Sequence, residues 1–126
     1  MTYNSSREVK HNIESLLNNY SILFDNLKPV RYIYNNDLSN TYHTGFILEE
    51  LYEAITEAGL TTADCAAYYN PGNSVDGGIN YIDIIALNTW QIQLLKPRMT
   101  AAEQEIKELK NKISTLEEEL ENLKNS

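Results

Sequence analysis

The segment 99–126 carries an unbroken heptad pattern, which constrains the fold more than any other feature of the sequence. Apolar residues stand at every a and d position of four heptads: Met99, Ala102, Ile106, Leu109, Ile113, Leu116, Leu120 and Leu123. This alternation of steps of three and four is typical of a coiled-coil seam. We therefore expect residues 97–126 to form a helix that joins copies of the chain in a coiled coil.

The charged residues beside this seam predict a parallel, in-register arrangement. Each g residue and the e residue five positions later have opposite signs, in the pairs Arg98–Glu103, Glu105–Lys110, Lys112–Glu117 and Glu119–Lys124. Such pairs meet between the chains of a parallel homo-oligomer, whereas the alternative, a lone charged helix, has no need of the alternation. Ile at a with Leu at d favours two strands only weakly, so both a dimer and a trimer stay open.

The composition argues against several classes of partner. The chain has 126 residues and a formal net charge of −8, whereas nucleic acid and anionic membrane surfaces both attract a basic face. No apolar run approaches the roughly 18 residues that a membrane-spanning helix needs, and the amino-terminal segment is polar rather than signal-like. The part before the coil is long enough for one compact domain with a modest core. We expect neither nucleic acid nor a membrane as a partner.

Metal and cofactor chemistry is not indicated either. The chain has a single cysteine, Cys65, which rules out an internal disulfide and a multi-cysteine metal site. It fits a small buried residue better than a reactive thiol, because no basic neighbour would favour the thiolate. His11 and His43 are far apart in the sequence, and no cluster of ligands accompanies them. We expect no metal and no cofactor.

Helical spacing recurs along the part of the chain before the coil. Apolar residues at steps of three and four predict a helix over 8–27, which ends before Pro29, and another over 48–58, for which Gly59 is the expected C-cap. The segment 82–95 predicts a further helix, and its apolar residues on more than one face indicate that it is buried.

Strand patterns lie between these helices. Alternating aromatic and β-branched residues predict strands over 30–34 and 42–47, which we expect to pair. The segments 66–69 and 79–81 flank a long turn-rich loop and predict a hairpin. The sequence therefore predicts an α+β body over 5–96, with small antiparallel strands packed among helices.

Pro97 interrupts the last predicted helix just before the coil. Extending the heptads backward places Pro97 at an outward f position, with Ile92 at a and Leu95 at d, so the register survives. We expect a kink or a short break rather than a new direction. If the helix restarts, Thr100 and Glu103 have the spacing of a capping box.

One pair of residues near the amino end is suited to catalysis. Ser5 and Lys10 lie where a loop enters the predicted first helix, and a serine–lysine pair is a minimal dyad in which an uncharged amine removes the hydroxyl proton. The alternative is that Ser5 or Ser6 caps the helix and that Lys10 is a solvated surface residue. The residues alone leave both interpretations open.

Four blocks of the sequence, however, carry a family resemblance. They are SSREVKHNI at 5–13, LKPVRY at 27–32, HTGFILEE at 43–50 and NYIDIIAL at 80–87. In order and spacing they resemble the C-terminal intramolecular chaperone domains of phage tailspikes, endosialidases, tail fibres and neck appendages, which also run into a terminal coiled coil. The Asn- and Tyr-rich composition is most similar to that of a neck appendage from a small Bacillus phage.

The resemblance implies a function. Such a domain forms a homotrimer, aligns an upstream fibre or appendage segment of its own chain, and then releases itself as a single-turnover serine–lysine endopeptidase. The family's nucleophile falls on Ser5 and its lysine on Lys10, so cleavage would separate Asn4 from Ser5 and leave residues 1–4 as an upstream remnant. The alternative is a non-catalytic trimerisation or attachment module in which Ser5 is only a helix cap.

Some positions depart from the family pattern, and they affect which residues could assist the Ser5–Lys10 dyad. Ser6 stands where the family has aspartate, and Glu8 is a stand-in for that carboxylate. His43 and Glu50 match polar residues of the third block and are further supporting candidates, whereas 48–49 is Leu-Glu in place of Ala-Gln.

The resemblance also implies a protonation state for Lys10, a role for the coil and a cellular setting. Lys10 must be uncharged to act as a base, and burial between chains or a cationic neighbour such as Arg7 would favour that form. If the coil trimerises first, the three upstream segments are already joined, and their alignment becomes effectively intramolecular. The resemblance places the protein in the host bacterial cytoplasm during virion assembly, and implies its absence from the mature virion after cleavage.

Overall fold

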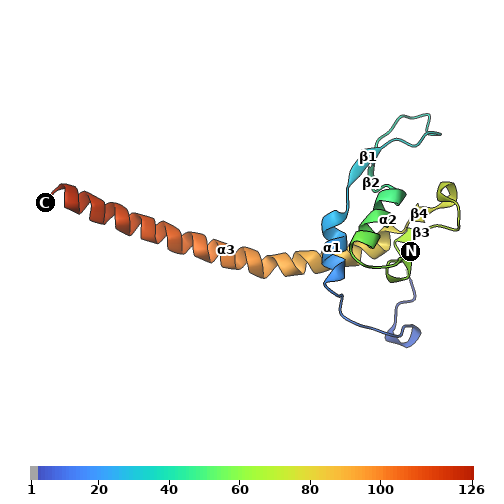
Figure 1. The fold of residues 1–126 in the computed structure, drawn as a ribbon, viewed down its shortest axis with the longest axis horizontal. Helices are drawn as coiled ribbons and strands as arrows, with labels where there is room; N and C mark the ends of the chain where they lie inside the picture. Colours follow the sequence, from blue (N-terminus) through green and yellow to red (C-terminus); the bar gives the residue numbers. More distant parts are fainter. Residues whose placement is uncertain (1–2) are drawn as a thin grey trace. The chain divides into compact units, whose positions relative to one another are not determined.

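The computed structural model describes residues 3–126. The chain divides into two compact units, Met1–Ile84 and Ile85–Ser126. The elements in chain order are η1 (Arg7–Val9), α1 (Asn19–Asn26), β1 (Val30–Tyr32), β2 (His43–Gly45), α2 (Leu48–Glu57), η2 (Thr62–Asp64), β3 (Tyr68–Tyr69), η3 (Ser74–Asp76), β4 (Gly78–Ile79) and α3 (Tyr81–Lys124) (Figure 1). The expected α+β class is confirmed.

The core of the first unit lies where α1 packs against α2. The buried residues of α2 are Leu51, Ala54 and Ile55, which share one face of the helix because they are three and four positions apart. Leu23 of α1 is fully buried, as is Ile55. Burial of each of these large side chains stabilises the fold by about 2 kcal/mol. Asn19 Nδ2 also donates a hydrogen bond of 2.7 Å to Ala58 O, which fixes the start of α1 against the end of α2.

The end of α2 confirms the predicted glycine cap. Gly59 has φ of +73°, a left-handed conformation that costs glycine little. The Leu60 N–H donates to Ile55 O at 3.1 Å and the Gly59 N–H donates to Thr56 O at 3.0 Å. These two bonds form a Schellman motif, which satisfies carbonyls that the helix would otherwise leave unpaired.

The two predicted strand pairs are present, although each is short. β1 and β2 are antiparallel, with Val30 opposite Gly45 and Tyr32 opposite His43. β3 and β4 form the second antiparallel pair. The strands predicted over 30–34 and 42–47 are thus three residues each, because the ladder ends where the polar loop begins.

The first predicted helix is wrong over most of its length. Instead of a helix over 8–27, residues 10–17 have no regular structure, and α1 begins only at Asn19. Asn12 has φ of 52°, which is incompatible with a right-handed helix. Val9 and Ile13 remain more than half exposed. An amphipathic helix depends on a surface that buries its apolar face, and α2 provides one for α1 but not for residues 9–17 of the same chain.

The helix predicted over 82–95 is present as the start of α3, but the prediction that it is buried fails for most of its apolar residues. Ile84 and Leu87 are buried, whereas Ile82, Ile85 and Ile92 are more than half exposed in the single chain. α3 continues through Pro97 without a break, so the helix does not restart. Thr100 does not form the capping box; its hydroxyl donates to Lys96 O at 3.1 Å.

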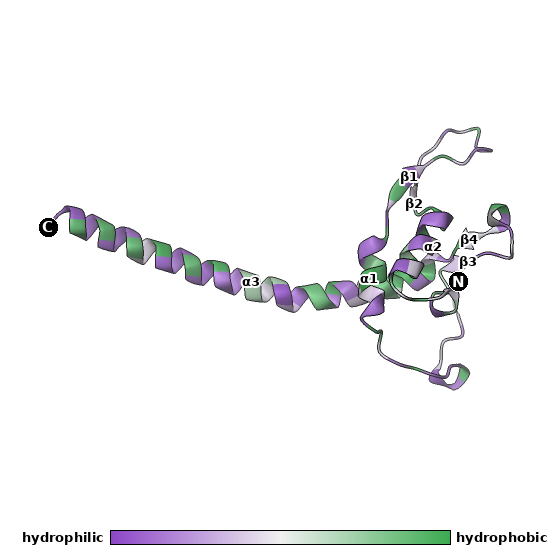
Figure 2. Cartoon of the chain, viewed as in Figure 1, coloured by the Kyte–Doolittle hydropathy of each residue, from purple (hydrophilic) through white to green (hydrophobic). Residues whose placement is uncertain are grey.

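The second unit is helical almost to its end, and the predicted a and d residues are open to solvent in the single chain. Hydrophobic and hydrophilic bands alternate along α3 (Figure 2). The a and d residues from Met99 onward, apart from Ala102, have exposed fractions between 48 and 72%. A lone helix gives these side chains nothing to pack against.

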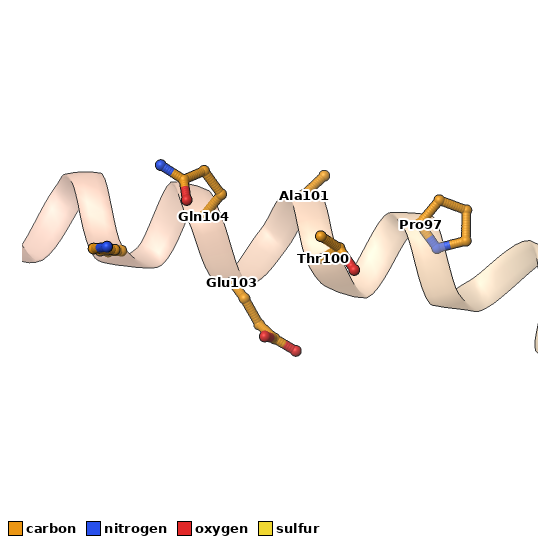
Figure 3. Close-up of a pocket in the computed structure, with 6 residues that line it drawn as sticks. Pro97, Thr100, Ala101, Glu103 and Gln104 are labelled. Atoms are coloured by element: carbon orange, nitrogen blue, oxygen red, sulfur yellow. The ribbon is translucent and has the colours of Figure 1, made fainter.

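A shallow hollow lies on α3 beside Pro97. Pro97, Thr100, Ala101, Glu103 and Gln104 line it (Figure 3). None of these residues is at an a or d position, although Glu103 is an e residue that flanks the predicted seam.

Candidate functional site

A tight turn at the amino end brings the two predicted catalytic residues together. Ser6 has extended dihedral angles (φ −61°, ψ 150°) and its Oγ accepts a hydrogen bond of 3.2 Å from the Glu8 N–H. This caps the single 3₁₀ turn η1. The Val9 N–H donates to Ser6 O at 3.1 Å, and the Lys10 N–H donates to Arg7 O at 3.2 Å. The chain therefore folds back on itself directly after Ser5.

The reversal sets Lys10 against Ser5. Lys10 Nζ donates a hydrogen bond to Ser5 Oγ. A base that removes the serine proton must lie within hydrogen-bond reach of the hydroxyl, and this contact satisfies that requirement. The predicted helix cap is also present, but it is Ser6 that caps the turn, which leaves the Ser5 hydroxyl to Lys10. Ser6 therefore caps the turn, while the neighbouring Ser5 contacts Lys10.

The dyad lies at the surface of the single chain. Asn4, Ser5 and Lys10 are all exposed. Burial that would favour an uncharged lysine is therefore not supplied by the chain itself.

The three supporting candidates lie in other surroundings. Glu8 contributes its backbone N–H to the Ser6 cap. Glu50 lies in the first turn of α2 and is half-buried, and its Oε2 is buried without a hydrogen-bond partner among the described residues. Within residues 3–126, no hydrogen bond or ion pair joins the side chain of Glu8, His43 or Glu50 to Ser5 or Lys10.

His43 belongs instead to an aromatic cluster on the β1–β2 hairpin. Its ring stacks on Tyr32, with centroids 5.8 Å apart, and lies edge-on to Tyr34 at 5.1 Å. His43 Nε2 is 3.8 Å from Asp37 Oδ2 in the loop between the strands. Hydrogen bonds from the Ser39 hydroxyl and N–H hold the pKa of Asp37 below its ordinary value.

Sequence reasoning did not identify this cluster, although a signal was present. Tyr32 and Tyr34 are two apart at the end of a strand and so lie on the same face, and the antiparallel register places His43 opposite Tyr32. The hydroxyls of the two tyrosines are 3.1 Å apart. This hydrogen bond, with a smaller contribution from burial, raises the pKa of Tyr32 well above its ordinary value.

Metal-binding clusters and membrane-spanning helices are both absent from the described residues. Across the described part of the chain, no group of three or more histidine, cysteine, aspartate or glutamate residues could hold a metal ion. Within the same residues, no helix has the length and apolar character needed to cross a membrane. Cys65 is half-buried, and burial raises the pKa of its thiol.

Comparison with known proteins bears directly on the turn at Ser5. Residues 5–60 match the family model Peptidase_S74, which is described as the chaperone of endosialidase. Over this segment, which is less than half of the chain, the sequence is similar to that chaperone family. The match begins at Ser5 and covers three of the four resembling blocks; the block at 80–87 lies beyond it. No curated protein and no solved structure matches the chain.

This similarity supports an intramolecular chaperone role for the segment and is consistent with an attached upstream segment. The family's name is that of a peptidase. Both statements agree with a serine and a lysine held in contact at the beginning of the matched segment.

Proposed function

We propose that the protein is a homotrimeric intramolecular chaperone that cuts its own chain between Asn4 and Ser5. The observation that carries this proposal is the hydrogen bond between Lys10 Nζ and Ser5 Oγ, at the start of the chaperone match. The upstream segment would be a phage fibre or appendage, assembled in the bacterial cytoplasm, and the released chaperone would be absent from the mature virion.

The cleavage begins with an acyl shift. Uncharged Lys10 takes the proton from Ser5 Oγ, which attacks the carbonyl carbon of Asn4. The bond from that carbon to Ser5 N breaks as the bond to Oγ forms, and the proton passes to the new amine of Ser5. The product is an ester between the Asn4 carbonyl and Ser5 Oγ. A second nucleophile then bonds to the Asn4 carbonyl carbon as the bond to Oγ breaks, which releases the upstream segment.

The turn suits an event that happens once per chain. A nucleophile and the carbonyl that it attacks belong to neighbouring residues, so the reactants are permanently held together. Specificity for a foreign substrate is not needed. Release after folding would leave the upstream fibre trapped kinetically in its folded state.

A fusion of a reporter domain upstream of Met1 tests the proposal. The parent should release a fragment whose partner begins at Ser5, identified by intact-mass measurement. Ser5→Ala should abolish release while the helical signal in circular dichroism is unchanged, because this exposed side chain contributes little to stability. Ser6→Ala is the matched control: it loses the side-chain cap but keeps the nucleophile and the two backbone hydrogen bonds that close the turn, and should still be cut.

The same measurement distinguishes the self-cleaving chaperone from the alternative function. A plain trimerisation or attachment module would give an uncut parent that is indistinguishable from Ser5→Ala. Loss of cutting in Ser6→Ala alone would move the nucleophile by one residue.

A further inference from the structure

Asn4 lies on the other side of the proposed scissile bond and is free to react. Its residue is exposed, in a stretch from 3 to 6 that belongs to no helix or strand. Within the described residues, no hydrogen bond or ion pair engages its side chain. Attack by its amide nitrogen, Nδ2, on its own carbonyl carbon closes a five-membered ring, and no secondary structure opposes the backbone rotation that this attack needs.

Water is less well placed to open the ester at Ser5. Lys10 is the one side chain in hydrogen-bond contact with Ser5 among the described residues. His43 faces Asp37 and the two hairpin tyrosines, and Glu50 lies in α2. A hydrolytic water would therefore have to be positioned by Lys10 alone, whereas the Asn4 amide is held at the carbonyl by covalent bonds. Effective concentrations for well-oriented intramolecular attack reach roughly 10⁵–10⁸ M, which offsets the weak nucleophilicity of an amide.

We propose that Asn4 is itself the second nucleophile of the reaction and that the upstream segment leaves with a C-terminal succinimide. This inference rests on the proposed self-cleavage and concerns its second step. Asn4 Nδ2 forms a bond to the Asn4 carbonyl carbon, the bond from that carbon to Ser5 Oγ breaks, and one proton passes from Nδ2 to Oγ. No water is consumed in this step.

Lys10 is placed to carry that proton. Its Nζ contacts Ser5 Oγ, which is the leaving oxygen of the ester. After the first step the proton rests on the new amine of Ser5 and Lys10 is again uncharged, so Lys10 takes the proton that Nδ2 loses and donates it to Oγ as the ester breaks. One lysine then serves both steps, first as a base and then as an acid.

The products distinguish the two routes. A succinimide-ended fragment is lighter than the hydrolysed fragment by one water molecule. It later opens at either carbonyl, which gives a mixture of C-terminal asparagine and its isomer with an α-amide and a free side-chain carboxylate. Direct hydrolysis of the ester gives C-terminal asparagine alone.

Mass spectrometry of the reporter fusion tests the proposal. Release is followed in the parent, and the upstream fragment is fragmented to locate its terminal carboxylate. We expect the lighter species at early times and both asparagine isomers at late times. A fragment that ends in ordinary asparagine at every time overturns the inference while leaving self-cleavage intact, whereas an uncut parent overturns both.

Two variants sharpen the result. Asn4→Asp keeps the shape of the side chain and removes the amide nitrogen, and Asn4→Ala removes the nucleophile altogether. In both variants we expect release to be at least about tenfold slower, and the ester-linked form to accumulate as a hydroxylamine-sensitive species of unchanged mass. Parent-like release rates in both variants would contradict a role for the Asn4 amide.

Discussion

Lys10 already contacts the oxygen that it is proposed to deprotonate. The amine donates to Ser5 Oγ in the structure, so catalysis needs no movement of the backbone but does need the loss of one proton. Lys10 is exposed in the single chain, and desolvation or a nearby positive charge favours an uncharged amine in general. Chemistry at this residue therefore depends on what covers it.

Replacement of Lys10 by arginine separates contact from proton transfer. A guanidinium can donate a hydrogen bond to Ser5 but stays protonated at any relevant pH. Lys10→Arg should therefore stop self-cleavage, measured as release from the reporter fusion, without loss of helical structure. The matched control is Arg7→Lys, which keeps the charge within η1 and should be cut at close to the parent rate. Normal cutting of Lys10→Arg would exclude Lys10 as the base.

The phenol of Tyr32 should keep its proton to unusually high pH. Its hydrogen bond with Tyr34 raises the pKa of Tyr32 above the ordinary tyrosine value of about 10. Because the folded state holds this proton more tightly than the unfolded state, the stabilisation is complete below that ordinary value and is lost as pH rises through the folded-state pKa. In a tyrosinate absorbance titration, Tyr32→Phe should remove the phenol that ionises last. An unchanged high-pH limb would contradict this assignment.

At the level of whole elements, the sequence predicted a helix correctly where neighbouring residues determine it, and incorrectly where contacts with distant residues determine it. α2 was predicted to within one residue of its end because its buried face lies within the helix and its glycine, Gly59, follows two residues after its end. The helix over 8–27 was overestimated because periodicity reports an apolar face but not whether anything covers it. Only the part that meets α2 became α1.

The candidate site shows the same division. Ser5 and Lys10 are close in sequence, and the short turn that joins them could be anticipated from a serine before a helical turn. The cluster of His43, Tyr32 and Tyr34 depends on strand register, which a single sequence does not specify. Because the position of His43 depends on the same register, the sequence alone did not determine whether His43 lies beside Ser5.

Gly45 is where the β1–β2 hairpin meets the start of α3. The Phe46 N–H donates to Tyr81 Oη at 3.2 Å, and a Cβ on Gly45 would collide with that hydroxyl and approach the Tyr32 ring to 3.3 Å. Gly45→Ala should therefore destabilise the first unit by about 1–3 kcal/mol, measured by urea unfolding.

Two further variants test this explanation. Gly78→Ala is the matched control, because a Cβ at Gly78 in β4 meets nothing within 4 Å; it should change stability far less. Tyr81→Phe removes the colliding hydroxyl, so the double variant with Gly45→Ala should show a favourable interaction free energy in a mutant cycle. Strict additivity would mean that the clash is not the cause.

For the whole molecule, the exposed apolar residues are the main feature that a single chain leaves unexplained. The a and d residues of α3 are exposed along the coil segment, and so are Val9, Ile13 and Leu17 near the dyad. Apolar surface on this scale is expected to be covered by association. Covering the segment 9–17 would also desolvate the neighbourhood of Lys10, so assembly and catalysis would be coupled through the proposed trimer.

Disruption of the coil tests this coupling. Leu109→Asp with Leu116→Asp places charges at two d positions, where an assembled coil would bury them at high cost. This variant should dissociate on dilution, and its self-cleavage should become steeply dependent on protein concentration. The assembled parent should cut at a rate that is independent of concentration. The measurement is fragment release against time over a dilution series wide enough to span the dissociation of the variant, with light scattering at each concentration.

A charge-matched control distinguishes the effect of charges at the seam of a and d residues from the effect of added charge alone. Gln104→Asp with Asn111→Asp adds the same two charges at outward f positions of α3, which a parallel coil leaves in solvent. This control should remain assembled and should cut like the parent at every concentration. If the seam variant instead dissociates yet cuts at the parent rate, each chain carries a complete active site. Lys10 would then lose its proton without help from a neighbouring chain, and cleavage would have to be timed by some event other than assembly.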